Sequence, residues 1–214
     1  MTSSLQDLGE RAAAQPARPK RVDLGCGRRQ VPGAIGLDID ALPGVAIVAD
    51  LSRGLPFRDN SLDEVYAIHI LEHFDNFIQI MEEIYRCCRP NAVLHIKVPH
   101  ASCSYVTWKD PTHRRGMLLS TFTYFDQTYF DGSAFRHYTS AHFRIEHAKL
   151  KFTLEGRDWV PRPRRLAEWI VHALANRDRR AQYLCERYWA NLVGIEEVEL
   201  RLRAIKDPAP PAGA

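Results

Sequence analysis

Two glycines one residue apart follow a short apolar run near the N-terminus, and this feature constrains the fold more than any other. Residues 21–27 read RVDLGCG, and the apolar residues before the glycines are typical of a buried strand. Gly25 and Gly27 allow a sharp backbone turn that comes close to a ligand. A second short segment, 35–38, ends in the carboxylate of Asp38. In α/β folds such a pair holds a nucleoside, with the backbone against its polar body and the acid on the ribose hydroxyls.

Two other interpretations of the glycine turn are weaker. A dinucleotide-binding fingerprint requires G-x-G-x-x-G, and Gln30 occupies the position of the third glycine. An ordinary strand and turn with solvated acids is the simpler alternative, but later segments fit the same α/β pattern. Residues 28–34, which include Pro32 and Gly33, are too few for the usual crossover helix, so we expect a loop or a single turn there.

The segment 22–27 (VDLGCG) resembles motif I of the class I S-adenosylmethionine (SAM)-dependent methyltransferases. Residues 55–65 (LPFRDNSLDEV) resemble a stretch of the ubiquinone and menaquinone-type branch, and the likeness to small bacterial and archaeal type 11 enzymes extends to about residue 206. The resemblance implies an α/β, Rossmann-like, doubly wound and mostly parallel seven-stranded sheet, with the last strand antiparallel and the first helix shortened. It also implies SAM as cofactor, with Asp38 on the ribose and Asp50 facing the adenine. The implied cofactor-binding residues are Asp23, Gly25, Cys26, Gly27, Asp38, Ile39, Asp50, Leu51 and Ile68.

The hydrophobic pattern divides the rest of the chain into alternating strands and helices. Further strands are expected over 45–48, 64–68, 92–98, 143–154 and 196–205, and helices over 77–89, 166–175 and 181–192. The segment 157–165 is predicted to be a basic loop broken by prolines. One methyltransferase domain over 20–206 would then lie between a flexible segment or frayed helix at 1–19 and a disordered tail at 207–214.

Composition narrows the classes of protein. No stretch approaches 18 consecutive apolar residues and the N-terminus has no apolar core behind a basic start, so no membrane span, membrane partner or secretory signal is expected. The five cysteines form no C-x-x-C pair, and their odd number argues against a disulfide framework, which fits a reducing cytoplasm. The net charge of +3 is too small to indicate nucleic acid by itself.

A cluster of metal-ligating residue types follows the expected fourth strand. In a helical turn, His69, Glu72 and His73 would share one face at spacings of three and four. Imidazole and carboxylate groups at the spacing H-x-x-E-H suit a borderline divalent metal such as zinc. His113, in the segment 110–115, is a candidate fourth ligand.

Plant small-RNA 2′-O-methyltransferases and ubiquinone-pathway O-methyltransferases carry a similar E-x-x-E-H stretch and a later histidine. In the RNA enzymes these residues hold magnesium beside the ribose hydroxyls. Glu72, His73 and His113 match that pattern, whereas His69 replaces a glutamate. The extra imidazole favours zinc, iron, manganese or nickel over magnesium, because hard cations prefer oxygen ligands. The alternative is that the L-E-H stretch is a packing and cap motif, in which His73 only forms a hydrogen bond.

Methyl transfer to a hydroxyl requires that its proton leave, either to a histidine (His73, His113 or His69) or with the help of a metal. O-methylation of a small molecule, a sugar or polysaccharide precursor, or a specialised metabolite is therefore the first hypothesis, by a monomer or homodimer. RNA ribose 2′-O-methylation is an alternative, since seven arginines between Arg157 and Arg180 could track phosphates, although a solvated basic face is the simpler interpretation. The remaining alternative functions are metal-free N-methylation and SAM binding without catalysis. The aromatic-rich segment 105–131 is expected to form the wall of the acceptor pocket, with part of its rings in the core.

Overall fold

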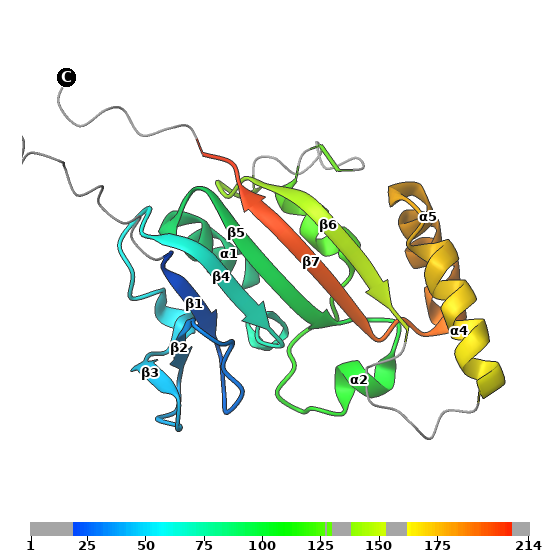
Figure 1. Ribbon diagram of the computed structural model, residues 1–214, viewed down its shortest axis with the longest axis horizontal. Coiled ribbons are helices and arrows are strands. Elements are labelled where there is room, and N and C mark those ends of the chain that lie inside the picture. The colour runs from blue at the N-terminus through cyan, green and yellow to red at the C-terminus, as the bar shows by residue number, and fades with distance from the viewer. Residues whose placement is uncertain (1–18, 127, 130–137, 153–161, 207–214) are drawn as a thin grey trace, which may run out of the picture.

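The computed structural model describes residues 19–126, 128–129, 138–152 and 162–206, which form one seven-stranded sheet (Figure 1). The strand order is β3-β2-β1-β4-β5-β7-β6. The pairs among β1 to β5 are parallel, and β7 runs antiparallel to both β5 and β6. The strands are β1 (Arg21–Leu24), β2 (Ile35–Asp38), β3 (Val45–Val48), β4 (Leu62–Ile68), β5 (Cys88–Pro99), β6 (Phe143–Lys151) and β7 (Glu197–Ala204). The predicted fold class and the antiparallel last strand are confirmed.

The connections in the first half of the sheet are short. No helix joins β1 to β2 or β2 to β3 in the described residues 25–34 and 39–44, so the expected loss of the first helix is confirmed. The helical segments elsewhere are η1 (Leu51–Arg53), η2 (Leu71–His73), α1 (Phe77–Cys87), α2 (Ser104–Trp108), α3 (Leu119–Phe122), η3 (Thr123–Phe125), α4 (Arg162–Ala175), α5 (Arg179–Leu184), the π-helical turn η5 (Cys185–Trp189) and α6 (Ala190–Val193).

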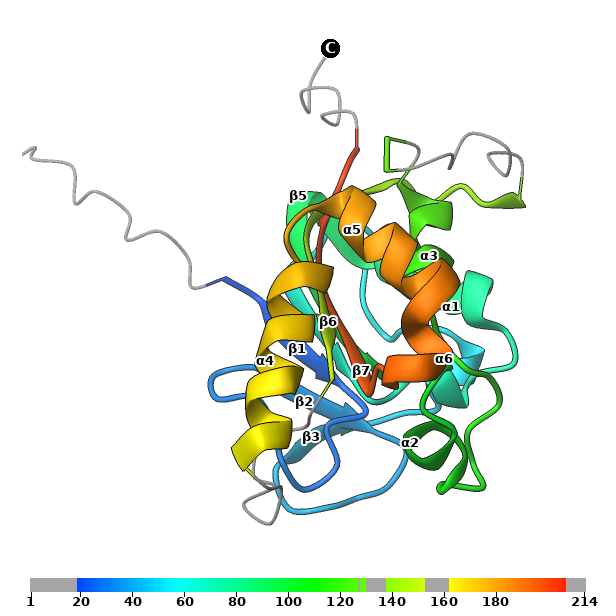
Figure 2. The same cartoon turned by 90° about the vertical axis from the view of Figure 1, so that its right-hand side faces the viewer.

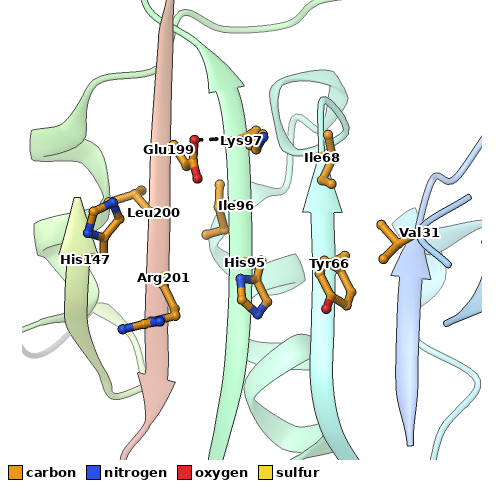
Figure 3. Close-up of a pocket in the computed structure, with 10 residues that line it drawn as sticks. All are labelled: Val31, Tyr66, Ile68, His95, Ile96, Lys97, His147, Glu199, Leu200 and Arg201. Carbon is orange, nitrogen blue, oxygen red and sulfur yellow. Dashed lines mark ion pairs between the residues drawn. The ribbon is translucent and has the colours of Figure 1, made fainter. Parts of the chain in front are cut away.

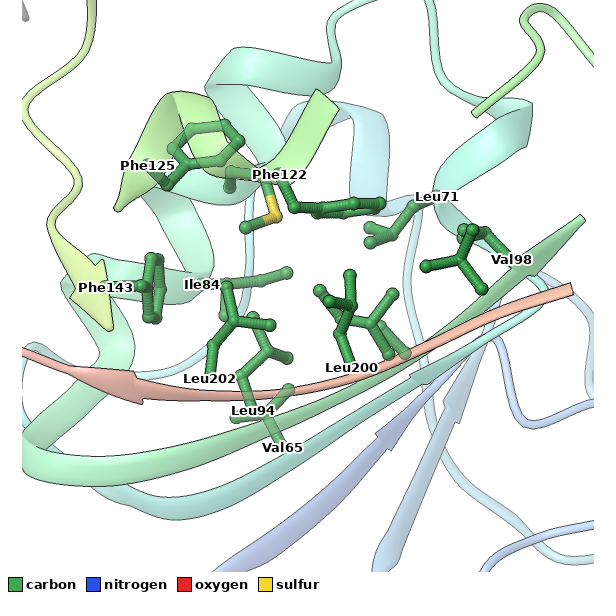
Figure 4. Packing of buried hydrophobic residues seen from close by; sticks show 14 of the residues in the cluster. Val65, Leu71, Ile84, Leu94, Val98, Phe122, Phe125, Phe143, Leu200 and Leu202 are labelled. Carbon is green, nitrogen blue, oxygen red and sulfur yellow. The ribbon is translucent and has the colours of Figure 1, made fainter. Parts of the chain in front are cut away.

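One face of the sheet is apolar and carries the core (Figure 4). The buried stripe of α1, which includes Ile84, packs there with Leu94 of β5 and Leu202 of β7. Phe122 of α3 and Phe143 of β6 close the same cluster. Each such side chain contributes roughly 1.5–3 kcal/mol on leaving water, so this one layer accounts for most of the hydrophobic stabilisation.

The opposite face is polar, and no described helix covers it over β1, β4 and β5 (Figure 1). The register places Tyr66, His95 and Arg201 in one row across β4, β5 and β7. The Tyr66 and His95 rings stack with centroids 4.7 Å apart. A cavity of about 480 Å³ runs over this face (Figure 3). The face is open because the helixless crossovers around β2 place no apolar surface on it.

Several element boundaries differ from those that the sequence predicted. The helix expected over 77–89 ends at Cys87, and Pro90 and Asn91 belong to the start of β5, where Asn91 takes a φ of +66°. The pairing of β4 with β5 shifts register at this point, so the predicted stop signal acts as an irregularity inside a strand. β6 ends at Lys151, because 152 is a bend, and the remainder of the predicted strand lies outside the described residues.

The C-terminal helices also begin earlier than expected. α4 begins at Arg162, so the end of the segment 157–165 is helical and the predicted loop is wrong there. Pro163 stands in the first turn, where its missing N–H would have no intrahelical partner anyway. The helix expected over 181–192 begins two residues sooner, because Asp178 accepts a hydrogen bond from the Ala181 N–H as its N-cap. The expected helix at 4–14, within 1–19, and the tail 207–214 lie outside the described residues.

Candidate active site

The glycine turn and the strand-end acid meet at the carboxyl ends of β1 and β2. The Gly27 N–H donates to Asp38 Oδ2 at 2.8 Å. Gly25 and Gly27 take φ angles of +62° and +52°, which side chains rarely adopt. A Cβ on Gly25 would lie 2.5 Å from Cδ1 of Ile70, whereas one on Gly27 would meet nothing within 4 Å. The turn is therefore closed toward η2 and open on the side of Gly27 and Asp38.

Asp23 anchors the loop that follows the glycine turn. Its side chain is 2% exposed, and Oδ2 accepts a hydrogen bond from the Val31 N–H at 2.7 Å. Burial raises the pKa of this carboxyl, against the opposing effect of the Val31 hydrogen bond. The contact ties the loop 28–34 to β1, which replaces the anchoring that a crossover helix would give.

The other residues that we expect to bind the cofactor differ in their exposure and contacts. Ile39 follows Asp38 and is 64% exposed, and Cys26 is buried with its N–H donated to the Leu37 carbonyl. Asp50 caps η1, where its carboxylate accepts hydrogen bonds from the Ser52 hydroxyl and N–H, and these bonds lower its pKa. Leu51 belongs to the core, and Ile68 lines the cavity of Figure 3. Their roles toward SAM stay predictions.

The segment 69–73 is not a continuous α-helix, so the predicted shared face is wrong in detail. His69 takes a φ of +53°, and only Leu71–His73 form a 3-10 turn, η2. Instead, potential ligand atoms of Glu72, His73 and His113 lie within 4.8 Å of one another.

His69 is engaged by acids. Its Nε2 lies 3.0 Å from Glu197 Oε2, and its Nδ1 lies 3.6 Å from Glu72 Oε1. The hydrogen bond to Glu197, and after it the nearby carboxylate of Glu72, raise the pKa of His69 to about 9. By distance, His69 lies beside the three-residue cluster, with each ring nitrogen facing a carboxylate.

Sequence reasoning missed Glu197. Because β7 runs antiparallel to β5, its first residue lies at the edge where the parallel strands end, and Glu197 pairs in register with Pro99. Lys151 of β6 contributes a second cation, with Nζ 2.9 Å from Glu197 Oε1. Burial raises the pKa of Glu197, but hydrogen bonds from His69 and Lys151 outweigh it and lower that pKa to about 2. The only signal in the sequence was a pair of acids opening an otherwise alternating strand.

Glu72 is the most unusual group of the site. The residue is 0% exposed, and neither carboxylate oxygen has a hydrogen-bond partner among the described residues. His113 Nε2 is 3.9 Å from Oε1, and the Glu72 carbonyl accepts a hydrogen bond from the Arg114 N–H at 2.9 Å. A buried carboxylate without a hydrogen bond is costly even with the His69 and His113 rings 3.6 and 3.9 Å away, so a further positive or donating group beside Glu72 would stabilise it.

The hydrogen bonds of both neighbouring histidines leave Nε2 available. The Thr112 hydroxyl donates to Asp110 Oδ1 at 2.6 Å, so its oxygen accepts from His73 Nδ1 at 2.9 Å. His113 Nδ1 donates to the Thr107 carbonyl at 2.5 Å. In the neutral rings, each Nε2 then carries a lone pair. Such outer hydrogen bonds, which fix the tautomer and the ring orientation, are typical of histidine ligands to metals.

The aromatic segment after β5 is divided between core and surface. Phe122, Phe125 and Tyr129 are almost fully buried, which confirms that part of these rings pack in the core. Tyr105 and Trp108 of α2 are 69% and 56% exposed. α2 follows the carboxyl end of β5, and Phe130 lies outside the described residues.

Comparison with known proteins places this geometry in context. Residues 22–96 match the family model of a methyltransferase domain, Methyltransf_11. A SAM-dependent methyltransferase from Archaeoglobus fulgidus is similar at a TM-score of 0.51 and 18% identity, over 87% of this chain and 86% of that one. The YcgJ protein of Bacillus subtilis has a TM-score of 0.52 and 16% sequence identity, over 92% of this chain and 95% of that one. A Haloferax volcanii methyltransferase, solved in complex with the Trm112 activator, has a TM-score of 0.51 and 15% sequence identity, over 88% of this chain and 83% of that one.

No curated protein matches the chain. None of the helices in the described ranges has both the length and the apolar character needed to cross a bilayer. The structural likenesses establish the fold, and the sequence match covers the glycine turn, Asp38 and the segment 69–73. The chain therefore has the fold of class I SAM-dependent methyltransferases, and its residues 22–96 match the type 11 methyltransferase domain.

Proposed function

We propose that this enzyme methylates a hydroxyl group of a small molecule or sugar precursor, with one divalent cation held by Glu72, His73 and His113. The observation that supports the cation is the Glu72 carboxylate, which is fully buried and has no hydrogen-bond partner among the described residues. A cation between Glu72 and the two imidazoles would offset the cost of that charge. The three donors lie close enough together to share one ion.

The donor set indicates which metal would fit. Two imidazole nitrogens and one carboxylate oxygen suit zinc, iron, manganese or nickel better than magnesium, which prefers oxygen ligands. The hydrogen bonds that the two rings donate to the Thr112 hydroxyl and the Thr107 carbonyl already orient both rings. Glu72 and His73 come from η2, and His113 comes from the loop after α2.

The residues divide the work of methyl transfer. Gly25, Gly27 and Asp38 would hold SAM, whose sulfonium already activates the methyl group, so the protein mainly aligns the acceptor oxygen with the methyl carbon. The oxygen–carbon bond forms as the carbon–sulfur bond breaks, and the hydroxyl proton must leave. A bound divalent ion lowers the pKa of such a hydroxyl. Without an ion, Nε2 of His73 or His113 would accept the proton as a general base.

The acceptor class follows from the same cluster. An ion bound by three protein ligands retains positions for two adjacent oxygens, as in a vicinal diol, a catechol or a sugar. Two exposed aromatic rings, Tyr105 and Trp108, would pack against the acceptor ring. RNA ribose methylation by the same chemistry and metal-free N-methylation are the competing functions.

Elemental analysis of the purified, untagged enzyme tests the proposal. We expect about one divalent ion per chain in the wild type, its loss in His73→Ala and in His113→Ala, and its retention in His147→Ala. His147 is the matched control because it is an exposed histidine on the open face of the sheet. Absence of metal from all four proteins after incubation with zinc, manganese or iron would refute the metal site and leave a histidine base.

The acceptor is tested separately, with labelled SAM and pools of diols, catechols, sugars, amines and RNA. Transfer to hydroxyl compounds that is lost in His73→Ala supports O-methylation. Transfer to amines alone, at equal rates with and without chelator, would favour the N-methyltransferase.

A further inference from the structure

The solvent-facing side of α4 is apolar. Leu166, Trp169, Ile170 and Leu174 are 61%, 67%, 44% and 62% exposed. Their spacing of three, four and eight residues places them on one arc of the helix. Ala175 and Val171 face the core instead. A helix on the surface of a protein normally presents polar residues to water. The outer arc of α4 instead presents these four large apolar residues.

A second apolar surface follows on the next helices. Tyr188, Trp189 and Leu192 of η5 and α6 are 64%, 56% and 78% exposed. α4 and α5 pack against each other at the β6 end of the sheet, away from β1, β2 and β3 (Figures 1 and 2). Two exposed tryptophans and several large aliphatic side chains thus gather at one end of the molecule, far more than the scattered single apolar residues of an ordinary surface.

The same segment holds the excess positive charge of the chain. Residues 162–193 contain seven arginines and three acids, a net charge of +4, whereas the whole chain carries +3. Two of those acids are occupied in the fold: Asp178 caps α5, and Glu186 is buried against His100. Arg177, Arg180 and Arg187 are exposed. The apolar end is therefore flanked by cations with few free anions.

We propose that this end of the molecule, formed by α4 and η5–α6, docks on an anionic lipid surface. An exposed apolar arc with tryptophan, flanked by arginines, is typical of helices that lie in the membrane interface. α4 has 14 residues, which is too short to span a bilayer, so the contact is peripheral. The proposal concerns a different surface from the methyl-transfer site and does not depend on the acceptor.

Lipid fits these residues better than the two other occupants. RNA would pair with the arginines and stack on single rings, but it would leave the aliphatic side chains Leu166, Ile170 and Leu174 in water. A second copy would bring the same arginine-rich flanks together, and like charges oppose such a symmetric contact. An anionic bilayer offers both acyl chains for the apolar arc and phosphates for the arginines.

Co-sedimentation with vesicles tests the proposal on the full chain. We expect the wild type to bind vesicles of phosphatidylglycerol and phosphatidylcholine in equal parts about tenfold more tightly than phosphatidylcholine alone, and to lose that preference as salt rises from about 0.05 to about 0.5 M. Trp169→Glu/Leu174→Glu should abolish binding. Trp108→Glu is the matched control, because Trp108 is similarly exposed on α2, and it should bind like the wild type.

A second pair of variants separates a specific loss of binding from a loss caused by misfolding. Arg177→Ala/Arg180→Ala should weaken binding to anionic vesicles at least about tenfold without a change in Tm, whereas Arg58→Ala/Arg144→Ala should not. No binding to anionic vesicles would overturn the proposal. A dimer in size-exclusion chromatography that Trp169→Glu/Leu174→Glu converts to monomer, without vesicle binding, would assign the surface to a second copy. Tight RNA binding that only the arginine variants lose would assign it to nucleic acid.

Discussion

Gly27 donates its backbone N–H to the carboxylate of Asp38 at 2.8 Å, so the fold itself joins the glycine turn to the acid that we expect on the SAM ribose. Asp38→Ala should weaken SAM affinity by about 10- to 100-fold, because charged hydrogen bonds are worth roughly 1.5–3 kcal/mol. Isothermal titration with SAM measures this. Asp40→Asn is the control, since that exposed acid uses only its backbone N–H on Asp38. Equal affinities in both variants would refute the ribose assignment.

The two glycines of the turn should respond differently to alanine. In Gly25→Ala the new Cβ meets the Ile70 side chain at 2.5 Å and the φ is +62°, so the variant should lose about 1–3 kcal/mol of unfolding free energy. In Gly27→Ala the Cβ has free space in the protein, so stability should fall by about 1 kcal/mol while SAM binding is lost. Urea unfolding and titration separate the two effects. Retained SAM affinity in Gly27→Ala would show that SAM does not pass over that residue.

Removing the charge of Glu72 separates metal binding from packing. In the presence of a chelator, Glu72→Gln should differ from the wild type by less than about 1 kcal/mol of unfolding free energy, because relief of a buried charge without hydrogen bonds offsets the lost ion pairs with His69 and His113. With zinc or manganese added, only the wild type should gain in Tm. The matched control is Asp75→Asn, an acid with an 82% exposed side chain three residues away. A gain in Tm for Glu72→Gln equal to that of the wild type would contradict the site.

Glu186 connects the C-terminal helices to the acceptor side of the sheet. Its buried carboxylate accepts hydrogen bonds from His100 Nε2 at 3.1 Å, from the Leu119 N–H at 2.5 Å and from the Ser120 N–H at 3.0 Å. The π-helical turn directs this residue inward. Glu186→Ala should therefore cost about 3–5 kcal/mol in urea unfolding, since it leaves a buried imidazole and two amides without a partner. Arg187→Ala, next to it but exposed, should cost less than about 0.5 kcal/mol.

Glu197 should contribute to stability only above acidic pH. Hydrogen bonds from His69 and Lys151 outweigh burial and lower its pKa from 4.5 to about 2, so folding favours its ionised form. That contribution is full above pH 4.5 and is lost as the pH falls through about 2. The stability difference between wild type and Glu197→Gln should accordingly shrink over this range in pH-dependent urea unfolding. A difference that stays constant between these pH values would show that the carboxylate is not paired.

Local sequence was sufficient for the part of the fold that depends on periodicity and glycine chemistry. The run before Gly25 and Gly27, the acid at the end of β2, the stripe of α1 and the alternation of β7 each predict their own element. They do so because backbone sterics and a single buried face act over a few residues. The metal-ligating types at 72, 73 and 113 were also evident from the sequence, although their contact was not.

The predicted element boundaries that were wrong are those at which long-range contacts compete with local sequence preference. Pro90 and Asn91 signal a stop, yet they enter β5 because β4 supplies a partner strand and a register shift absorbs them. Arg162 to Arg165 look like a loop in sequence, but α4 buries Val171 and Ala175 against the core and extends N-terminally through Pro163. Packing energy gained far along the chain decides both cases.

The sequence by itself determined the class of sheet, the glycine turn with its strand-end acid, and the residue types of the candidate metal cluster, because all of these are encoded within short segments. Only the tertiary structure decided that His69 bends away to Glu197 while Glu72 is left buried beside His73 and His113. It also decided that the outer arc of α4 is exposed, because no described element packs on it. Such contacts depend on which strands become neighbours, and β7, the last strand in sequence, inserts between β5 and β6.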